Sequence, residues 1–201
     1  YGIPIFRSLA RSGIIYRKDW FDKFNLEVPK TTEEWYEATK AIVEGDANGN
    51  GNRDEYAFML DRSSFDLSVS SFMNRLSVGL GAPNMWGEQD GQLLPSFMSE
   101  EYRDVLALFR RLYAENLINR DFAITERSQN DDEWTAGNAG AQVVVANNAF
   151  SRSEDVKNIP GAVVDVAPLQ TPEGRRAAAE SGNNGFLVFP RSTVQSEDHL
   201  R

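Results

Sequence analysis

The sequence contains no cysteine and only one histidine, His199. The lack of cysteine excludes disulfide frameworks, cysteine-ligated zinc, iron–sulfur clusters and thiol catalysis. A single histidine argues against a Ser-His-Asp triad and against a metal site built from several histidines. No apolar run approaches the roughly 20 residues that a membrane-spanning helix needs. The sequence therefore lacks the most common nucleophilic and soft-metal sites.

Basic residues are also scarce, 21 against 30 acidic ones, so the 201-residue chain has a formal net charge of −9. This balance argues against nucleic-acid binding, because phosphate contacts need clustered lysine and arginine. A hydrophobic fraction of 41% and a charged fraction of 25% are typical of globular rather than disordered chains. The chain opens on Tyr1 without a recognisable signal peptide, and we expect it to be part of a longer protein.

Helix and strand signals alternate along the chain, which predicts a mixed α/β lobe with helix in excess. Thr31 and Glu34 predict a capping box and a helix that ends at Gly45, and Ser99 predicts a second amphipathic helix. We expect Asp19 to cap a short helix and Leu106 to lie on the apolar face of the helix after Ser99. Further helices are expected at 19–24, at 65–80 and after Ser196, a hairpin at 85–93, and strands at 1–6, 13–16, 56–60, 142–146, 163–167 and 185–190.

The segment 46–55, DANGNGNRDE, spaces oxygen-bearing side chains as calcium loops do. Oxygen ligands fall at relative positions 1, 3, 5 and 9, glycine at position 6, where such loops turn sharply, and a backbone carbonyl at position 7. Position 12, usually a bidentate glutamate, is Ala57, so we expect Glu55 to take that role. A polar turn without a cation is the alternative. The predicted ligands of a structural Ca²⁺ are Asp46, Asn48, Asn50, Asn52 through its backbone oxygen, Asp54 and Glu55.

Further stretches carry a resemblance to a known family. Residues 1–6 (YGIPIF), 11–20 (RSGIIYRKDW) and 29–35 (PKTTEEW), followed by the 46–55 loop, resemble the extracellular solute-binding proteins of ABC importers. The similarity is greatest to the carbohydrate-binding lipoproteins and the alginate-binding proteins. Looser matches are found at 101–122, 135–140 and 185–190. In this family the loop ligates calcium, and all six residues predicted above match its pattern.

The resemblance implies a type II periplasmic-binding-protein-like α/β fold, in which this chain is a single helix-rich lobe with a small mixed sheet. Residues 1–201 would then form one lobe, mainly the C-terminal one, with crossing strands near 1–6 and 185–190. It implies binding rather than catalysis, an ABC permease as partner, a lipid anchor outside this chain, a bacterial cell-surface location and a monomer. The expected ligand is an oligosaccharide, which the fragment alone should bind weakly.

Sugars are held by aromatic faces and planar polar side chains, which we expect at strand ends. The group that follows the strand at 142–146 is the first candidate, and Trp86 on the hairpin is the second; Trp134, expected on a loop, is a weaker one. As alternatives, Trp86 covers a sheet edge, Arg7 and Arg11 pair with local carboxylates, and the asparagines form turns. The expected ligand-binding residues are Phe6, Arg7, Arg11, Trp86, Asn147, Asn148 and Phe150.

Two other functions remain open at this point. A glycosidase needs one carboxyl group in an apolar pocket that keeps its proton, and only Asp165, between valines, is a faint candidate. A calcium-dependent adhesion or signalling domain would fit the 46–55 loop alone. One loop without a partner loop argues against a calcium sensor.

Overall fold

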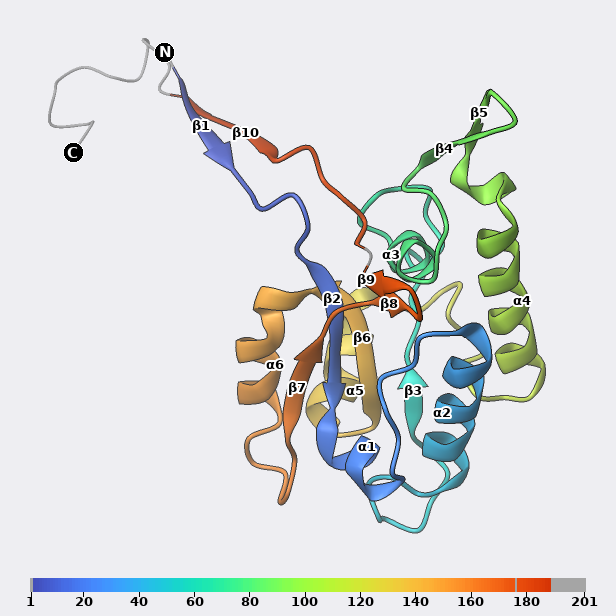
Figure 1. Cartoon of the computed structure of the whole chain (residues 1–201). Helices are drawn as coiled ribbons and strands as arrows, with labels where there is room; N and C mark the ends of the chain where they lie inside the picture. Colours follow the sequence, from blue (N-terminus) through green and yellow to red (C-terminus); the bar gives the residue numbers. More distant parts are fainter. Residues whose placement is uncertain (1, 176, 189–201) are drawn as a thin grey trace, which may run out of the picture. The chain divides into compact units, whose positions relative to one another are not determined.

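The chain divides into two units in the computed structural model, which describes residues 2–175 and 177–188 (Figure 1). The first unit consists of residues 1–10 and 179–201, and the second of residues 11–178. In the first unit, β1 (Gly2–Phe6) pairs antiparallel with β10 (Asn183–Val188). The expected strands at 1–6 and 185–190 therefore pair with each other. Phe189, Pro190 and the helix expected after Ser196 lie outside the described residues.

A four-stranded mixed sheet forms the centre of the second unit. In spatial order it contains β3 (Tyr56–Phe58), β6 (Ala139–Val145), β2 (Ser12–Arg17) and β7 (Val164–Ala167). Strands β3 and β6 are parallel, whereas β2 is antiparallel to both β6 and β7. Because β3 and β6 run in the same direction, their carboxyl ends meet at one edge of the sheet, where α/β proteins often bind ligands.

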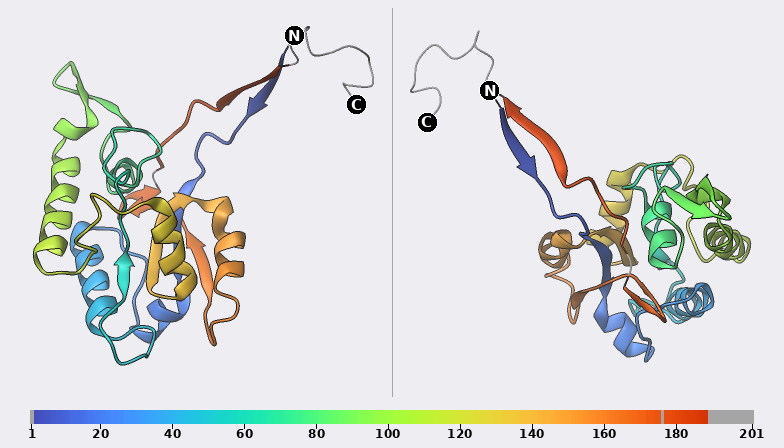
Figure 2. Two further views of the ribbon diagram at one scale, coloured as in Figure 1. Left: turned by 180° about the vertical axis from the view of Figure 1, so that it is seen from behind. Right: turned by 45° about the horizontal axis from the view of Figure 1, so that its top comes forward.

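Helices cover both faces of this sheet, as the view from behind shows (Figure 2). Ile14 and Tyr16 of β2 contribute to the larger core, while Ile15 packs in a smaller core with Trp134 and Val156. This alternation is what a strand with two covered faces requires. The larger core packs against α1 (Lys18–Lys23), α2 (Thr32–Glu44), α3 (Phe72–Gly79) and α4 (Glu100–Ala114), and the smaller core against α5 (Arg127–Ala136) and α6 (Ala149–Asp155).

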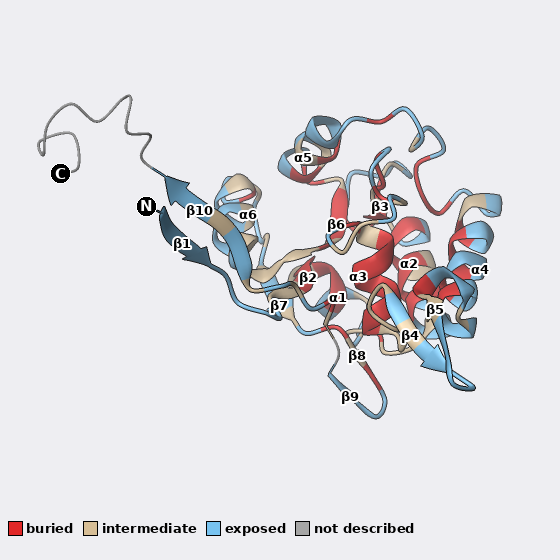
Figure 3. Cartoon of the chain, turned by 90° about the horizontal axis from the view of Figure 1, so that it is seen from above, coloured by how far each residue is buried: buried red, intermediate tan, exposed pale blue. Residues whose placement is uncertain are grey.

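Helix α3 is shorter than its apolar spacing predicts, and most of it is buried (Figure 3). The helix begins at Phe72. The residue before it, Ser71, is the N-cap, and its hydroxyl accepts a hydrogen bond from the Asn74 N–H at 3.1 Å. The residues before it form turns, although Phe65 still packs against the larger core. The expected helix over 65–80 is therefore wrong in its first half, because apolar side chains in a folded turn can be buried as well as those on a helix face.

The starts of the two long helices agree with the prediction. The Thr31 hydroxyl accepts from the Glu34 N–H at 3.2 Å, but the Glu34 carboxylate accepts from the Lys30 N–H at 2.6 Å, one residue before the cap. Ser99 accepts from the Tyr102 N–H at 3.2 Å. On α4 the expectation for the apolar face is wrong at one position, because Leu106 is exposed. The buried face has helical spacing and consists of Tyr102, Val105, Leu108, Phe109 and Leu112.

Two expectations about shorter helices are wrong. Asp19 is not the cap of α1, which begins one residue earlier; Asp19 instead accepts from the Arg17 guanidinium at 2.8 and 2.6 Å. Trp134 is not on a loop, because it lies in α5, fully buried, with its indole N–H donating to the Arg152 carbonyl at 3.0 Å. Helix α5 has almost no apolar periodicity, so its sequence carried little helical signal.

Two further ribbons complete the second unit. Strands β4 (Trp86–Gln89) and β5 (Gln92–Pro95) form the predicted hairpin, in which Asp90 and Gly91 both have positive φ, 53° and 75°, as a type I′ turn requires. Strands β8 (Gln170–Thr171) and β9 (Gly174–Arg175) form a second short antiparallel pair. Short 3₁₀ turns occupy Ser96–Met98 and Ala146–Asn148. None of the helices in the described ranges is long and apolar enough to cross a membrane.

Candidate functional site

The segment 46–55 forms a tight loop between α2 and β3. Asp46, Gly49 and Gly51 have positive φ values of 49°, 75° and 81°. Gly51 is the position at which the sequence predicted a sharp turn. A Cβ at Gly49 or Gly51 would meet no atom within 4 Å, so backbone conformation rather than space favours glycine at both positions.

Asp46 and Glu55 each leave one buried carboxylate oxygen without a partner. Asp46 Oδ2 accepts from the Gly51 N–H at 3.1 Å, and Glu55 Oε1 accepts from the Asn48 N–H at 3.0 Å. The other two oxygens, Asp46 Oδ1 and Glu55 Oε2, are buried and accept no hydrogen bond from the described part of the chain. A buried acceptor without a partner costs about 1–3 kcal/mol, and more when it is charged. A cation would satisfy both oxygens, so the loop fits one.

Two asparagines of the loop, Asn48 and Asn50, donate to the same carboxylate. Asn50 Nδ2 donates to both oxygens of Asp54 at 3.1 Å, and Asn48 Nδ2 donates to Asp54 Oδ1 at 3.3 Å. Asn48 Oδ1 accepts from the Asn50 N–H at 3.0 Å, and Asn50 Oδ1 accepts from the Asn52 N–H at 2.7 Å. Each amide oxygen keeps a second lone pair for a cation.

The donor set of this loop is entirely oxygen, which calcium prefers. Within residues 2–175 and 177–188, no three histidine, cysteine or acidic side chains gather closely enough to hold a metal by themselves. A cation here must therefore use amide and main-chain oxygens as well as carboxylates. The residues that would hold it are the six predicted from the sequence: Asp46, Asn48, Asn50, Asn52, Asp54 and Glu55.

Two residues outside the loop tie it to the core. Lys23, at the end of α1, donates to the carbonyl oxygens of Asp46 and Ala47 at 2.6 and 3.3 Å. Asn138, just before β6, accepts from Asn48 Nδ2 at 3.4 Å, while its own Nδ2 donates to Glu133 of α5 at 2.8 Å. Sequence reasoning missed both ties, because nothing in the local pattern marks residues that meet the loop only after folding.

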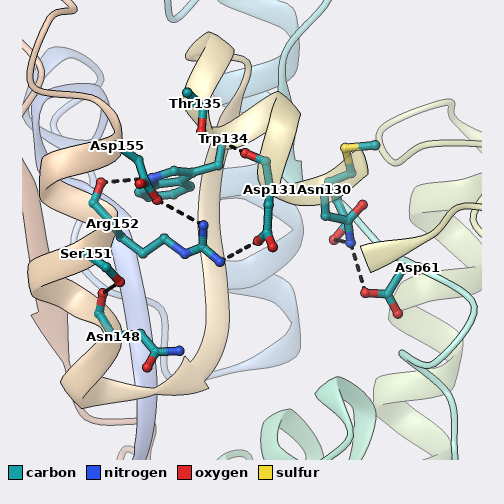
Figure 4. A network of polar contacts seen from close by, with 10 residues as sticks. Asp61, Asn130, Asp131, Trp134, Thr135, Asn148, Ser151, Arg152 and Asp155 are labelled. Carbon is teal, nitrogen blue, oxygen red and sulfur yellow. Dashed lines mark hydrogen bonds and ion pairs between the residues drawn. The ribbon is translucent and has the colours of Figure 1, made fainter. Parts of the chain in front are cut away.

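A polar cavity of about 70 Å³ lies beside β6 and the segment that follows β3. Its walls also include the N-terminal ends of α3 and α5. Asn130 of α5 donates to Asp61 Oδ2 at 3.1 Å and to the Met59 carbonyl at 3.3 Å (Figure 4). Asn130 Oδ1 and Gln142 Oε1 are buried and accept no hydrogen bond within the described residues. Both residues line the cavity, so two amide acceptors lie unpaired in its wall.

Arg152 of α6 holds the α5 wall of this cavity in place (Figure 4). Its guanidinium forms ion pairs with Asp131 of α5 and, at 3.1 Å, with Asp155. Its carbonyl accepts the Trp134 indole N–H. No local sequence pattern marks this network or the cavity; Asp61, directly after a predicted strand, is the one local signal that points to them.

The predicted ligand-binding residues of the second unit fall in two places. Asn147 is exposed and Asn148 half-buried in the 3₁₀ turn after β6, and Phe150 in α6 is 78% exposed. These residues do not form the expected loop, because the chain turns directly from β6 into short helices. Arg11 adjoins this group, since its carbonyl accepts from the Ala146 N–H at 2.9 Å. Trp86 lies apart from them in sequence, on β4, and is 58% exposed.

The remaining two predicted residues belong to the first unit. Phe6 ends β1 and Arg7 follows it, and both are exposed. The Arg7 N–H donates to the Gly182 carbonyl at 2.9 Å and so extends the contact between the two chain segments of this unit. Trp20 and Trp35 are both buried in the larger core and do not belong to a binding surface.

Residues 1–197 match the family of bacterial extracellular solute-binding proteins. The chain belongs to this family. It is 35% identical over 205 residues to lipoprotein LipO and 33% identical over 202 residues to the polygalacturonan/rhamnogalacturonan-binding protein YtcQ, both of Bacillus subtilis. The whole chain is covered in each alignment, but it spans only 41% and 40% of those relatives. Membership in this family confirms the resemblance inferred from the sequence.

The fold agrees with that of solved solute-binding proteins. The crystal structure of an extracellular solute-binding protein from Bifidobacterium longum subsp. infantis superposes with a TM-score of 0.68 at 21% identity, covering 91% of this chain and 40% of that one. The family consists of binding proteins, which confirms the prediction that the chain is not an enzyme. Consistent with this, Asp165, the one faint candidate for a catalytic acid, is exposed on β7 rather than placed in an apolar pocket.

Proposed function

We propose that this solute-binding chain is the ligand-binding lobe of an ABC-importer lipoprotein that binds oligosaccharides. The observation that carries the proposal is the polar cavity, in which Asn130 Oδ1 and Gln142 Oε1 are buried acceptors without hydrogen-bond donors. A saccharide carries many hydroxyl donors, whereas an apolar ligand would leave both oxygens unsatisfied. The name of the relative YtcQ, which describes a polysaccharide-binding protein, supports the same ligand class.

The two-strand ribbon supports the proposal that this chain is one lobe of a larger binding protein. Strands β1 and β10 expose apolar side chains, among them Ile3, Phe6, Phe186 and Val188. Exposed apolar groups of this kind typically mark surfaces that another part of a protein covers. In this proposal β1 and β10 are crossing strands to a second lobe, the ligand lies in the cleft, and the full-length protein is a monomer, lipid-anchored at the bacterial cell surface, that delivers its ligand to an ABC permease.

Calcium in the 46–55 loop is part of the proposal and has a structural role. A bound Ca²⁺ would supply positive charge to Asp46, Asp54 and Glu55 and satisfy the two orphaned oxygens. The chain's own residues position the loop: Lys23 binds its first carbonyls and Asn138 connects it to the start of β6. Calcium would therefore fix the end of α2 against the start of β3.

The ligand proposal is tested by calorimetric titration of the full-length protein with a defined panel. The panel contains oligogalacturonates, rhamnogalacturonan fragments, maltooligosaccharides, amino acids and dipeptides. We expect one saccharide class to bind with a Kd of about 1 μM or tighter, and the isolated 1–201 chain to bind at least about 100-fold more weakly, because it presents only one side of a cleft. Binding of a dipeptide or amino acid, with no saccharide bound, would contradict the proposal.

A further inference from the structure

A second hollow, of about 190 Å³, lies against the β4–β5 hairpin. Met85, Trp86, Pro95 and Phe97 line it from the hairpin side, and Leu67 lines it from the segment before α3. The Trp86 side chain is 58% exposed, so a large part of its indole surface is open to solvent. The groove therefore presents an aromatic surface to solvent.

Polar groups line the same groove. Asp66, Ser68 and Tyr102 contribute to its wall, and burial raises the pKa of the Tyr102 phenol above its ordinary value. Asn74 is buried; its Nδ2 donates to the Val69 carbonyl at 3.2 Å, and its Oδ1 accepts no hydrogen bond in the described ranges. An aromatic face next to a small number of polar side chains is the composition that binds a sugar ring, which has apolar C–H faces and hydroxyl edges.

The backbone at the groove is held in an uncommon conformation. Met85 has a φ of 66°, a value that few residues other than glycine and asparagine adopt. Its carbonyl accepts from the Ser96 N–H at 2.8 Å, which fixes the base of the hairpin. Such conformations persist where the surrounding structure imposes them, and they are concentrated at binding sites. Met85 directly precedes Trp86, so this backbone conformation sets the start of β4.

The segment that leads into α3 lines both the groove and the polar cavity. Ser70 and Ser71 line the cavity, whereas Leu67 and Ser68 line the groove. On the helix itself, Asn74 lines the groove. Because neighbouring residues of one segment line both hollows, a ligand that extends along this segment would contact both.

We propose that the groove is a second carbohydrate subsite, in which Trp86 stacks on one ring of a saccharide whose other end occupies the polar cavity. The inference rests on the proposed function, since it requires a saccharide ligand. It goes further in assigning the ligand a minimum length. Affinity depends on the number of sugar units, and the added affinity of the longer ligands comes from Trp86.

The experiment uses the full-length protein and a chain-length series, oligogalacturonates of two to six units, with maltooligosaccharides of the same lengths in parallel. We expect the Kd of the wild-type protein to fall by about 10-fold or more with length, as a stacked ring contributes. In Trp86→Ala this gain is lost while the affinity for the shortest bound saccharide changes less than about 2-fold. Trp86→Phe retains most of the gain, because it keeps an aromatic face.

Leu93→Ala is the matched control, because Leu93 is an exposed apolar residue of the same hairpin, 68% exposed, that does not line the groove. Its Kd values should equal those of the wild type at every length. Equal losses at all lengths in Trp86→Ala, or no loss at any length, would overturn the subsite while leaving the proposed function intact. Failure of every saccharide in the series and in the panel above to bind would overturn both.

Discussion

The calcium loop and the polar cavity are built in opposite ways. All the oxygen ligands expected in the loop come from one ten-residue segment. The two buried oxygens without a hydrogen-bond partner belong to Asp46 and Glu55 at the ends of this segment. The cavity takes its polar groups from segments far apart in the sequence, such as Asp61, Asn130 and Gln142. A site encoded in one short segment can be read from spacing, whereas a site assembled from several segments exists only after the layers pack.

The loop and the cavity should also differ in how mutations affect folding and binding. Besides the buried Ala47, Lys23 and Asn138 tie the loop to the core, so changes to its oxygen ligands should affect cation binding more than folding. The cavity wall depends on α5, which is held to α6 through Arg152 and the fully buried Trp134. Changes there should affect folding and ligand binding together.

The largest expected effect is on the α5–α6 side. Trp134→Ala removes a buried aromatic side chain and leaves the Arg152 carbonyl without its donor, so we expect a loss of about 3–5 kcal/mol in the free energy of unfolding. Urea denaturation measures it. Trp86→Ala is the control, and its exposed position predicts a change within about 0.5 kcal/mol. Similar losses in the two variants would show that the α5–α6 layer does not depend on Trp134.

The next effect concerns the loop. If calcium binds, its presence at about 100 times Kd should stabilise the wild-type protein by about 2.7 kcal/mol. The double variant Asp46→Asn with Glu55→Gln should lose this gain, because both orphan oxygens lose their charge. Thermal melting with calcium and with chelator measures the gain. Glu44→Gln, which neutralises an exposed carboxylate next to the loop, should retain it; equal melting of the wild type in both conditions is the contradicting result.

Loss of the cavity acceptors should weaken ligand binding without a large effect on the loop. Asn130→Ala or Gln142→Ala removes one hydrogen-bond acceptor for the saccharide, so we expect the Kd to rise by about 10-fold, equivalent to about 1.4 kcal/mol. Calorimetry with the saccharide that binds best gives the Kd. Asn158→Ala, at an exposed position outside the cavity, should leave it unchanged. Identical Kd values in all three variants would show that the ligand does not bind in the cavity.

A smaller effect tests the connection between the loop and the core. Asn138→Ala removes the tie from Asn48 to the start of β6, and we expect calcium affinity to fall by about 10-fold, as is common when residues that orient metal ligands are lost. Calcium titration by calorimetry measures this change. A calcium affinity equal to that of the Asn158→Ala variant would contradict this prediction.

The smallest effect is a loss of stability at alkaline pH. Burial raises the pKa of Tyr102 above 10.0, so the folded state retains the phenol proton at pH values where the unfolded chain has lost it. The contribution of Tyr102 to stability should therefore be constant below about pH 10 and decline as the pH rises through the folded-state pKa of this phenol. Thermal melts from pH 8 to pH 11 should show a shallower decline in Tyr102→Phe. Parallel declines would contradict the assignment.

Much of the fold could be predicted from local patterns. Thr31, Ser99 and the Asp90-Gly91 turn have strong signals because each depends on hydrogen bonds or dihedral angles within a few residues. Helix α5 escaped prediction, because its one buried aromatic residue, Trp134, gives no periodicity. The groove at Trp86 could be suspected from one exposed aromatic residue, but its other wall, around Leu67, comes from a segment whose apolar spacing indicated a helix.

The sequence by itself determined the oxygen-rich loop, the two capped helices and the hairpin turn, because short-range geometry is encoded in adjacent residues. Tertiary structure decided which polar groups remain unsatisfied: Asn130 and Gln142 are ordinary polar residues until α5 packs over β6 and removes them from water. It also decided which polar residues, such as Asn138, support the loop from a distance. The physical reason is that burial, unlike turn geometry, is a property of the packed layers and not of any one segment.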